Sequence, residues 1–554
     1  MALREFFARH RMASAVAAPA VLGVAAVVAA SLALTSSPQT RDTQLTSSVT
    51  ECHDMVTISV AGRGDTPVAG TTKLLVDANG AELPAALSGD HSSEWVDPVV
   101  NAPANAVEPG SYAAVYIAYP ANMASYEDAV NTGVANTEQV MREIAQACPD
   151  TKFSIVGYSE GADVVRRVAM TVGHQEADKD GGYGIVDPAN VVGVVILADA
   201  GRTAGDGPFP GAQDPNHPDG FDQQYQNGAN PTPGQGALPG TSGDFGALNG
   251  KIASFCSDGD LTCSAPQNIS LLQLAVNVGR QLNVDALERD GLTPATGQDV
   301  AVTLGNIALA AFADIQSQPN WMQSNETFLQ VLLRVSDPAY KPGATPTTPA
   351  KADSIATNDM SSLAYLPQKV FNEIVGLIVT NQNTIPVIMS DPYQQTLGPN
   401  HTGHHFDYWH DANAADGKPL TSAEYAAAWL THLAQQAQAG KTVDTTAKPD
   451  EADLAAAYKA ATTSPTPTSQ PTTSTTVAPT TTKTGVSSTT TPPSTTSVPP
   501  STTSSPAVTP EVTTTPAPTS AAAPTDTTKP TTTTTAPTTT TTTTSAVPTT
   551  TSTK

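Results

Sequence analysis

The chain has 554 residues and a formal net charge of -25 at pH 7, from 51 acidic side chains against 26 Lys and Arg. Because a surface that binds phosphates has to be basic, this charge balance argues against nucleic acid as a partner. The composition is uneven along the chain, so only part of its length can bury a hydrophobic core.

The N-terminal segment, residues 1–41, has the pattern of an export signal. Three arginines precede an apolar run over residues 12–34, and Ser31 and Ala33 form a small-x-small site for cleavage after Ala33. The same run is long enough to span a bilayer if it is left uncleaved, and it would then attach the protein to a membrane. Either outcome predicts a secreted or envelope-associated protein, outside the cytoplasm, where disulfides persist.

Residues 42–461 alternate between short β-branched runs and helical patterns. Several of the runs are apolar on both faces, which is typical of parallel strands covered by helices. The expected strands are residues 55–60, 113–119, 153–156, 191–197 and 251–255. Residues 125–148 carry apolar side chains on one stripe and predict a helix between the second and third strands. The pattern predicts an α/β fold with a central parallel sheet.

Three segments depart from this alternation. Residues 204–246 are dense in Gly, Pro, Asp and Asn and predict a long surface loop. Residues 264–400 contain several amphipathic runs, so we expect a helical insertion or cap there. Residues 462–554 are almost wholly Thr, Ser, Pro and Ala, and they lack the apolar surface that would offset chain entropy. We expect a disordered tail in that region.

Residues 157–161 read GYSEG, a G-x-S-x-G pattern that also arises by chance. The pattern lies between the strand expected at 153–156 and a helix expected at 162–172, which is the arrangement of a nucleophile elbow. Its two glycines permit a tight turn and a close approach of the helix. Ser159 is therefore the candidate nucleophile, and the helix N-terminus offers N–H groups to an oxyanion.

A serine nucleophile needs a general base that is itself oriented by an acid, and in α/β-hydrolases both come later in the chain. Asp258 and Asp260 follow the expected strand at 251–255, and their spacing does not choose between them. The candidate bases are His401, His404, His405, His410 and His432. A metal site in the H-x-x-H-H run is the competing interpretation, but the run lacks the glutamate of an H-E-x-x-H motif. We therefore expect no metal and no cofactor.

The four cysteines predict two disulfides in an exported chain, and three pairings are possible. Cys256 and Cys263 enclose a short loop that a bond could close easily, which would leave Cys52 with Cys148. The spacing lacks the paired C-x-x-C units that are typical of zinc sites.

Four segments together resemble the cutinase family of serine esterases. ECHDMVTISVAGRGDTP is similar to the family's first cysteine, strand and R-G-[ST] turn, and ACPDTKFSIVGYSEGA to its second cysteine, strand and G-Y-S-Q-G elbow. CSDGDLTC resembles the C-x-x-G-D-x-x-C acid loop, and HFDY resembles the H-x-x-Y that follows it. The resemblance covers residues 52–264 and resumes near His405.

The resemblance implies roles and bonds residue by residue. It makes Ser159 the nucleophile, Asp260 the orienting acid and His405 the general base. Asp258 is then left with a structural role, and His404 is the second choice for the base. The implied disulfides are Cys52–Cys148 and Cys256–Cys263.

Two residues depart from the family pattern at the expected oxyanion hole. Asp65 stands where the family has Ser or Thr, and Glu160 stands where it has Gln. The backbone amides of both residues can still form the hole, but a carboxylate beside it opposes developing negative charge. We therefore expect modest activity or a preference for mildly acidic pH.

The expected function is that of an exported serine carboxylesterase or lipase-like hydrolase that acts through an acyl-serine intermediate. Because apolar helices in residues 264–400 could cover Ser159, we expect a lipid ester as substrate; a helical module packed away from the site is the alternative. An envelope-lipid acyltransferase with the same triad, or a catalytically degenerate cell-surface protein, are the competing functions.

Overall fold

The computed structural model describes residues 48–203, 234–342, 366–416, 418–440 and 451–463. The expected export signal, most of the expected surface loop at 204–246 and nearly all of the Thr- and Pro-rich tail lie outside these residues.

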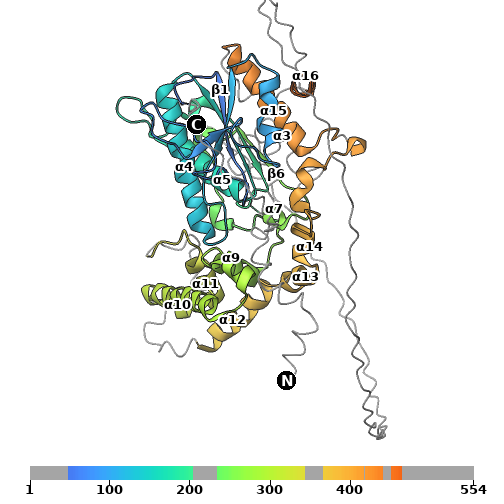
Figure 1. Ribbon diagram of the computed structural model, residues 1–554. Helices are drawn as coiled ribbons and strands as arrows, with labels where there is room; N and C mark the ends of the chain where they lie inside the picture. The colour runs from blue at the N-terminus through green and yellow to red at the C-terminus, as the bar shows by residue number, and fades with distance from the viewer. Residues whose placement is uncertain (1–47, 204–233, 343–365, 417, 441–450, 464–554) are drawn as a thin grey trace, which may run out of the picture. The chain divides into compact units, whose positions relative to one another are not determined.

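A six-stranded sheet in the order β2-β3-β1-β4-β5-β6 forms the centre of the fold (Figure 1). The strands are β1 Met55–Val60, β2 Ala85–Leu87, β3 Tyr112–Ile117, β4 Lys152–Tyr158, β5 Val191–Leu197 and β6 Ile252–Phe255. All pairings are parallel except that of β2 with β3. The predicted α/β fold is confirmed. The short edge strand β2 was not expected, because three residues are too few to show a strand period.

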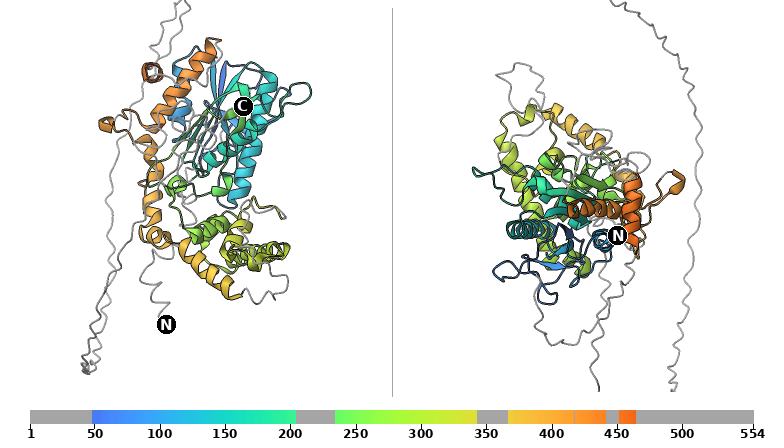
Figure 2. Two further views of the ribbon diagram at one scale, coloured as in Figure 1. Left: turned by 180° about the vertical axis from the view of Figure 1, so that it is seen from behind. Right: turned by 90° about the horizontal axis from the view of Figure 1, so that it is seen from above.

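Helices cover both faces of this sheet, as Figures 1 and 2 show. On one face, α4 (Tyr126–Ala147) and α5 (Glu160–Gly173) bury their valines against the strands. On the other face, α3 (Asp97–Val100) and α15 (Ser422–Gln438) pack over a second cluster of buried side chains, and α16 (Glu451–Thr462) packs on α15. Each strand is thus buried on both sides, which explains why the strand runs are apolar without alternation.

The described residues between 264 and 400, which are 264–342 and 366–400, form helices and no further strand of the sheet. The helices that follow β6 are α7 Leu261–Ser264, α8 Ser270–Gly279, α9 Val284–Asp290, α10 Pro294–Ser317, α11 Phe328–Ser336, α12 Leu366–Val379, α13 Thr384–Met389 and α14 Pro392–Thr396. Helices α9 to α13 gather beyond α7, at one end of the sheet (Figure 1). Helices α10 and α11 share a small apolar core of their own.

Short 3-10 helices complete the described structure. They are η1 Ala102–Asn105, η2 Pro188–Asn190, η4 Pro239–Thr241, η5 Gly246–Leu248, η6 Trp321–Gln323, η8 His404–Trp409 and η9 Ala414–Asp416. The last helix of the insertion is α14. It is followed by η8, which packs against α14 and against α15.

Two disulfides tie the chain together in the pairing that the family resemblance implies. Cys52 is bonded to Cys148 with a Cα–Cα distance of 5.5 Å, and this bond joins the start of β1 to the end of α4. Cys256 is bonded to Cys263 with a Cα–Cα distance of 5.7 Å. The second bond closes the loop between β6 and α7.

Candidate active site

Ser159 occupies the sharp turn between β4 and α5. Its backbone has φ 59° and ψ -123°, a conformation that is costly for a residue with a side chain. A Cβ at Gly157 would lie 2.4 Å from the carbonyl oxygen of Gly161, and a Cβ at Gly161 would lie 2.1 Å from that of Val60. Only glycine fits at these two positions, because a Cβ would overlap a backbone oxygen. The turn therefore has the geometry expected of a nucleophile elbow.

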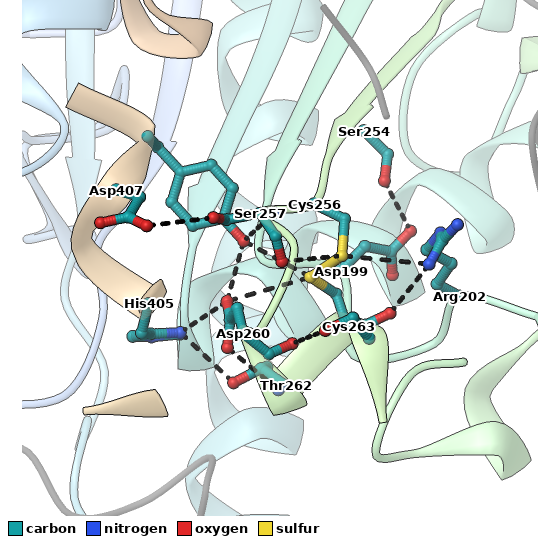
Figure 3. The surroundings of a disulfide bond; sticks show 12 residues. Asp199, Arg202, Ser254, Cys256, Ser257, Asp260, Thr262, Cys263, His405 and Asp407 are labelled. Carbon is teal, nitrogen blue, oxygen red and sulfur yellow. Dashed lines mark hydrogen bonds and ion pairs between the residues drawn. A yellow bond between two sulfur atoms is a disulfide. The ribbon is translucent and has the colours of Figure 1, made fainter. Parts of the chain in front are cut away.

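Three side chains from distant parts of the chain meet at this turn. The Ser159 hydroxyl lies 3.0 Å from His405 Nε2, and His405 Nδ1 lies 3.0 Å from Asp260 Oδ2. Figure 3 shows the His405 ring directed at Asp260 beside the disulfide. All three side chains are buried, with His405 only 1% exposed. If Nδ1–H donates to the carboxylate, Nε2 is free to accept the serine proton.

Asp260 is held by several donors at once. Its carboxylate accepts hydrogen bonds from the Thr262 N–H at 3.0 Å and from the Tyr408 hydroxyl at 2.8 Å, in addition to His405. Burial by itself would raise the pKa of Asp260, but the adjacent His405 ring and these hydrogen bonds outweigh burial and lower the pKa. The carboxylate therefore stays ionised and can fix the imidazole.

Tyr158 and Thr262 also position His405, and the sequence did not assign a role to either. The Tyr158 ring stacks on the imidazole at 5.1 Å, and its hydroxyl donates to the backbone carbonyl of His405 at 2.8 Å. The Thr262 hydroxyl lies 3.3 Å from His405 Nδ1. The only signal for these contacts was proximity in sequence, because Tyr158 adjoins the nucleophile and Thr262 lies in the acid loop.

The other candidate residues lie elsewhere. His404 is half-exposed and pairs with Asp407 at 2.7 Å, so it does not reach Ser159. His401 packs on Phe406, and Asp258 is exposed on the loop. His432 lies on α15 and contacts Gln436. Among the described residues no group of three or more His, Cys, Asp or Glu side chains is arranged to hold a metal ion.

An aromatic cluster borders the site on the side of η8. Trp95 contacts Phe406 at a ring-centroid distance of 5.0 Å and Trp409 at 5.1 Å, and Trp409 also meets Tyr158 at 4.8 Å. These side chains come from segments before α3, at the end of β4 and in η8. Sequence reasoning missed this cluster, because its members are too far apart in the chain to form a pattern.

The two residues expected to form the oxyanion hole differ in their backbone contacts. Glu160 is the first residue of α5, where a helix N–H has no partner four residues earlier. The Asp65 N–H donates to the Gly62 carbonyl at 3.2 Å. A Cβ at Gly62 would lie 3.0 Å from Cβ of Ser159, so this turn adjoins the nucleophile.

Burial raises the pKa of both acidic side chains at these positions. Burial raises the pKa of Asp65 to about 6, against the lowering effect of a hydrogen bond from the Ser93 hydroxyl at 2.5 Å. Burial also raises the pKa of Glu160 well above its ordinary value, although Arg63 acts in the opposite direction. Neither carboxyl oxygen of Glu160 has a hydrogen-bond partner within the described structure.

The chain is similar to known esterases over part of its length. Residues 75–276 match the family model described as Cutinase, a range that includes Ser159 and Asp260 and ends before His405. The protein described as "Carboxylesterase Culp6 homolog", from Corynebacterium glutamicum, is 32% identical over 154 residues, which are 27% of this chain and 46% of that protein. The chain thus spans less than half the length of this curated relative.

Several solved structures are also similar, at low identity. Lysin B from Mycobacteriophage D29 is 18% identical with a TM-score of 0.28, over 45% of this chain and 86% of that one. The catalytic core of acetyl xylan esterase from Trichoderma reesei is 19% identical with a TM-score of 0.23, over 42% and 95% of the two chains. A cutinase-like protein from Cryptococcus sp. is 16% identical with a TM-score of 0.24, over 43% and 95%. The family match covers residues that include the elbow and the acid loop, and it confirms the resemblance to the cutinase family over residues 75–276.

Proposed function

We propose that this protein is a serine hydrolase of carboxylic esters. The observation that carries the proposal is the buried chain of hydrogen bonds from Ser159 through His405 to Asp260, with both contacts at 3.0 Å. A hydroxyl, an imidazole and an ionised carboxylate in this order form the constellation that activates a serine for acyl transfer.

In the first half of the reaction, Ser159 Oγ attacks the ester carbonyl while His405 Nε2 takes its proton. The carbonyl oxygen becomes an oxyanion, which the free N–H of Glu160 can bind at the positive end of α5. The tetrahedral intermediate then collapses, and the alcohol leaves with the proton that His405 returns. Asp260 stabilises the imidazolium between these two transfers.

In the second half, water replaces the alcohol. His405 removes a proton from the water, which attacks the acyl-serine, and the acid product leaves as the proton returns to Ser159 Oγ. The Asp65 N–H can serve as a second oxyanion donor if it gives up its hydrogen bond to the Gly62 carbonyl. That exchange is inexpensive, because 3.2 Å is at the long end for such a bond.

For the substrate class and location, we propose lipid esters and a site of action outside the cytoplasm. The apolar helices between Asp260 and His405 support a lipid substrate, and the two disulfides support an exported protein. An acyltransferase would use the same three residues and differ only in the group that accepts the acyl chain.

The test is hydrolysis of p-nitrophenyl acetate, octanoate and palmitate by the full chain and by Ser159→Ala. We expect the substitution to lower kcat by roughly a thousandfold or more, with no effect of EDTA on the wild type. Ser242→Ala, at a serine remote from the elbow, is the matched control and should retain full activity. Equal activity of Ser159→Ala would refute the proposal. A stoichiometric burst of p-nitrophenol without turnover would instead indicate an acyltransferase that lacks its acceptor.

A further inference from the structure

The helical insertion exposes apolar side chains that nothing in the described structure covers. Among the described residues, every large hydrophobic side chain that is substantially exposed lies between residues 264 and 400, except Val68. We call the outward sides of α10, α12 and α13 the apolar face. Its most exposed members include Leu309, Phe312, Phe371, Ile374, Ile378 and Met389, each more than half exposed. Soluble proteins rarely expose so many large apolar side chains on neighbouring parts of one segment unless these side chains bind something.

The charged side chains of the same helices are turned toward the protein. Lys369 on α12 is only 4% exposed, and its ammonium donates to backbone carbonyls that include that of Trp321, at 3.1 Å, while it lies over the Trp321 ring. Asp314 on α10 is 6% exposed and pairs with Arg334 of α11 at 2.5 Å. A helix that faces water has the opposite arrangement, with charges outside and apolar side chains inside.

The other two charges of these helices are also engaged. Asp299 on α10 accepts the Asn283 N–H at 2.9 Å, and Glu373 on α12 accepts the Phe328 N–H at 2.8 Å. Helix α13 has no charged residue. The apolar face therefore presents hydrocarbon with almost no charge, which suits an apolar medium.

Helix α10 supports the same conclusion by its length and composition. It is the one helix of the described residues that is long and apolar enough to cross a membrane, and its most apolar stretch is only 22% buried, whereas the core helix of a soluble protein is mostly buried. Its inner side packs on α11 through the Asp314–Arg334 pair and a shared apolar cluster. A helix held to its own domain in this way lies along a lipid surface rather than across it.

We propose that the apolar face docks on a lipid surface and inserts its side chains into the hydrocarbon. Because the face carries no exposed Lys or Arg on its three helices, it does not select anionic headgroups, and a surface of zwitterionic or uncharged lipid suits it best. A second copy of the chain is the competing occupant, and the second experiment below distinguishes it from lipid.

Contacts from α9 fasten the insertion to the sheet domain near the candidate active site. Arg63, in the turn next to Gly62, forms an ion pair with Asp285 of α9. The Val284 N–H donates to the Met123 carbonyl at 2.8 Å. The insertion is thus fastened beside the turn that adjoins Ser159, so the sheet domain stays attached to the insertion when the apolar face docks.

The first experiment measures immersion at two positions in the full chain. An environment-sensitive fluorophore is attached at Ile378→Cys on the apolar face or at Thr132→Cys on the exposed side of α4, and phosphatidylcholine vesicles with or without a nitroxide lipid are added. We expect a blue shift and quenching at position 378 only. Higher salt or added phosphatidylglycerol should not strengthen the effect. If the vesicles bind the protein but leave position 378 in water, the N-terminal apolar segment carries the binding and the proposal is wrong.

The second experiment compares partition onto the same vesicles. Phe371→Ser/Ile374→Ser/Ile378→Ser should weaken partition by about tenfold or more, because three exposed apolar side chains lose their transfer into hydrocarbon. Val68→Ser, an equally exposed apolar residue outside the insertion, should have no effect. If the wild type sediments as a dimer without vesicles and the triple variant as a monomer, the face binds a second copy, and the lipid proposal is overturned. Ser159→Ala should bind like the wild type, so this result is independent of hydrolysis.

Discussion

The Tyr158 hydroxyl donates a 2.8 Å hydrogen bond to the backbone carbonyl of His405, and the two rings stack at 5.1 Å. Tyr158, the residue before the nucleophile, therefore contacts both the backbone and the imidazole ring of His405, the candidate base. Tyr158 ends β4, whereas His405 returns from a helical insertion, so this contact fixes a long-range junction of the chain.

We predict that Tyr158→Phe lowers kcat by about tenfold while KM stays nearly constant. The phenyl ring preserves the stacking, but the buried carbonyl of His405 loses its donor, which costs about 1–3 kcal/mol of stability. The measurements are steady-state kinetics and thermal unfolding.

Tyr112→Phe is the matched control for this variant. The Tyr112 hydroxyl is also buried and donates to the Val100 carbonyl, but it lies away from the site. The Tyr112→Phe variant should therefore be less stable than the wild type but have the same kcat. An equal loss of kcat in both variants would show that Tyr158 acts only on folding.

We predict that Asp260→Asn lowers kcat by about a thousandfold or more, because the amide no longer selects the tautomer in which Nε2 accepts a proton. The variant should fold, since the Cys256–Cys263 disulfide still closes the loop. Asp258→Asn, two residues earlier and exposed, should behave as the wild type. Similar losses in the two variants would contradict the assignment of Asp260.

We predict that ionisation of Asp65 lowers the free energy of unfolding and the catalytic activity as pH rises. Its pKa is about 6 in the folded protein and near 3.8 when unfolded, so the folded state binds the proton more tightly. Stability from this group is therefore present below about pH 4 and is lost as pH rises through 6. Asp65→Asn should raise the melting temperature little at pH 4.5 and clearly at pH 7.5.

The same substitution has a kinetic consequence. Above pH 6 an ionised Asp65 would oppose negative charge on an oxyanion nearby. The ratio of kcat/KM for Asp65→Asn to that for the wild type should therefore rise between pH 5 and pH 8, since the two proteins differ in no other side chain. A ratio that stays flat would place the Asp65 carboxylate outside the reach of the reaction.

We predict that Gly161→Ala destabilises the elbow by several kcal/mol and abolishes turnover. The added Cβ would lie 2.1 Å from the Val60 carbonyl oxygen, which belongs to the sheet and cannot move aside. Gly305→Ala on α10 is the matched control, because no atom lies within 4 Å of its added Cβ. That variant should gain up to about 1 kcal/mol in the free energy of unfolding, from helix propensity.

The sequence by itself determined the features that local patterns encode. Continuous apolar runs predicted the parallel strands, because strands buried on both faces have no polar side. The GYSEG turn between a strand and a helix predicted the elbow, since the close approaches at Gly157 and Gly161 are made by neighbouring elements. The family resemblance added Asp260 and His405, and the structure brings both to Ser159.

Only the tertiary structure decided the contacts that join distant segments. The Tyr158 hydroxyl meets the His405 carbonyl across 247 positions of sequence separation, and no period or motif encodes such a distance. The helical insertion is a second example. Its amphipathic runs predicted helices, but the sequence did not show which side of each helix packs on the protein, because that depends on contacts with distant segments. In α12, Lys369 is buried because its ammonium binds backbone carbonyls and the Trp321 indole ring. The apolar side chains on the opposite side of α12 are exposed.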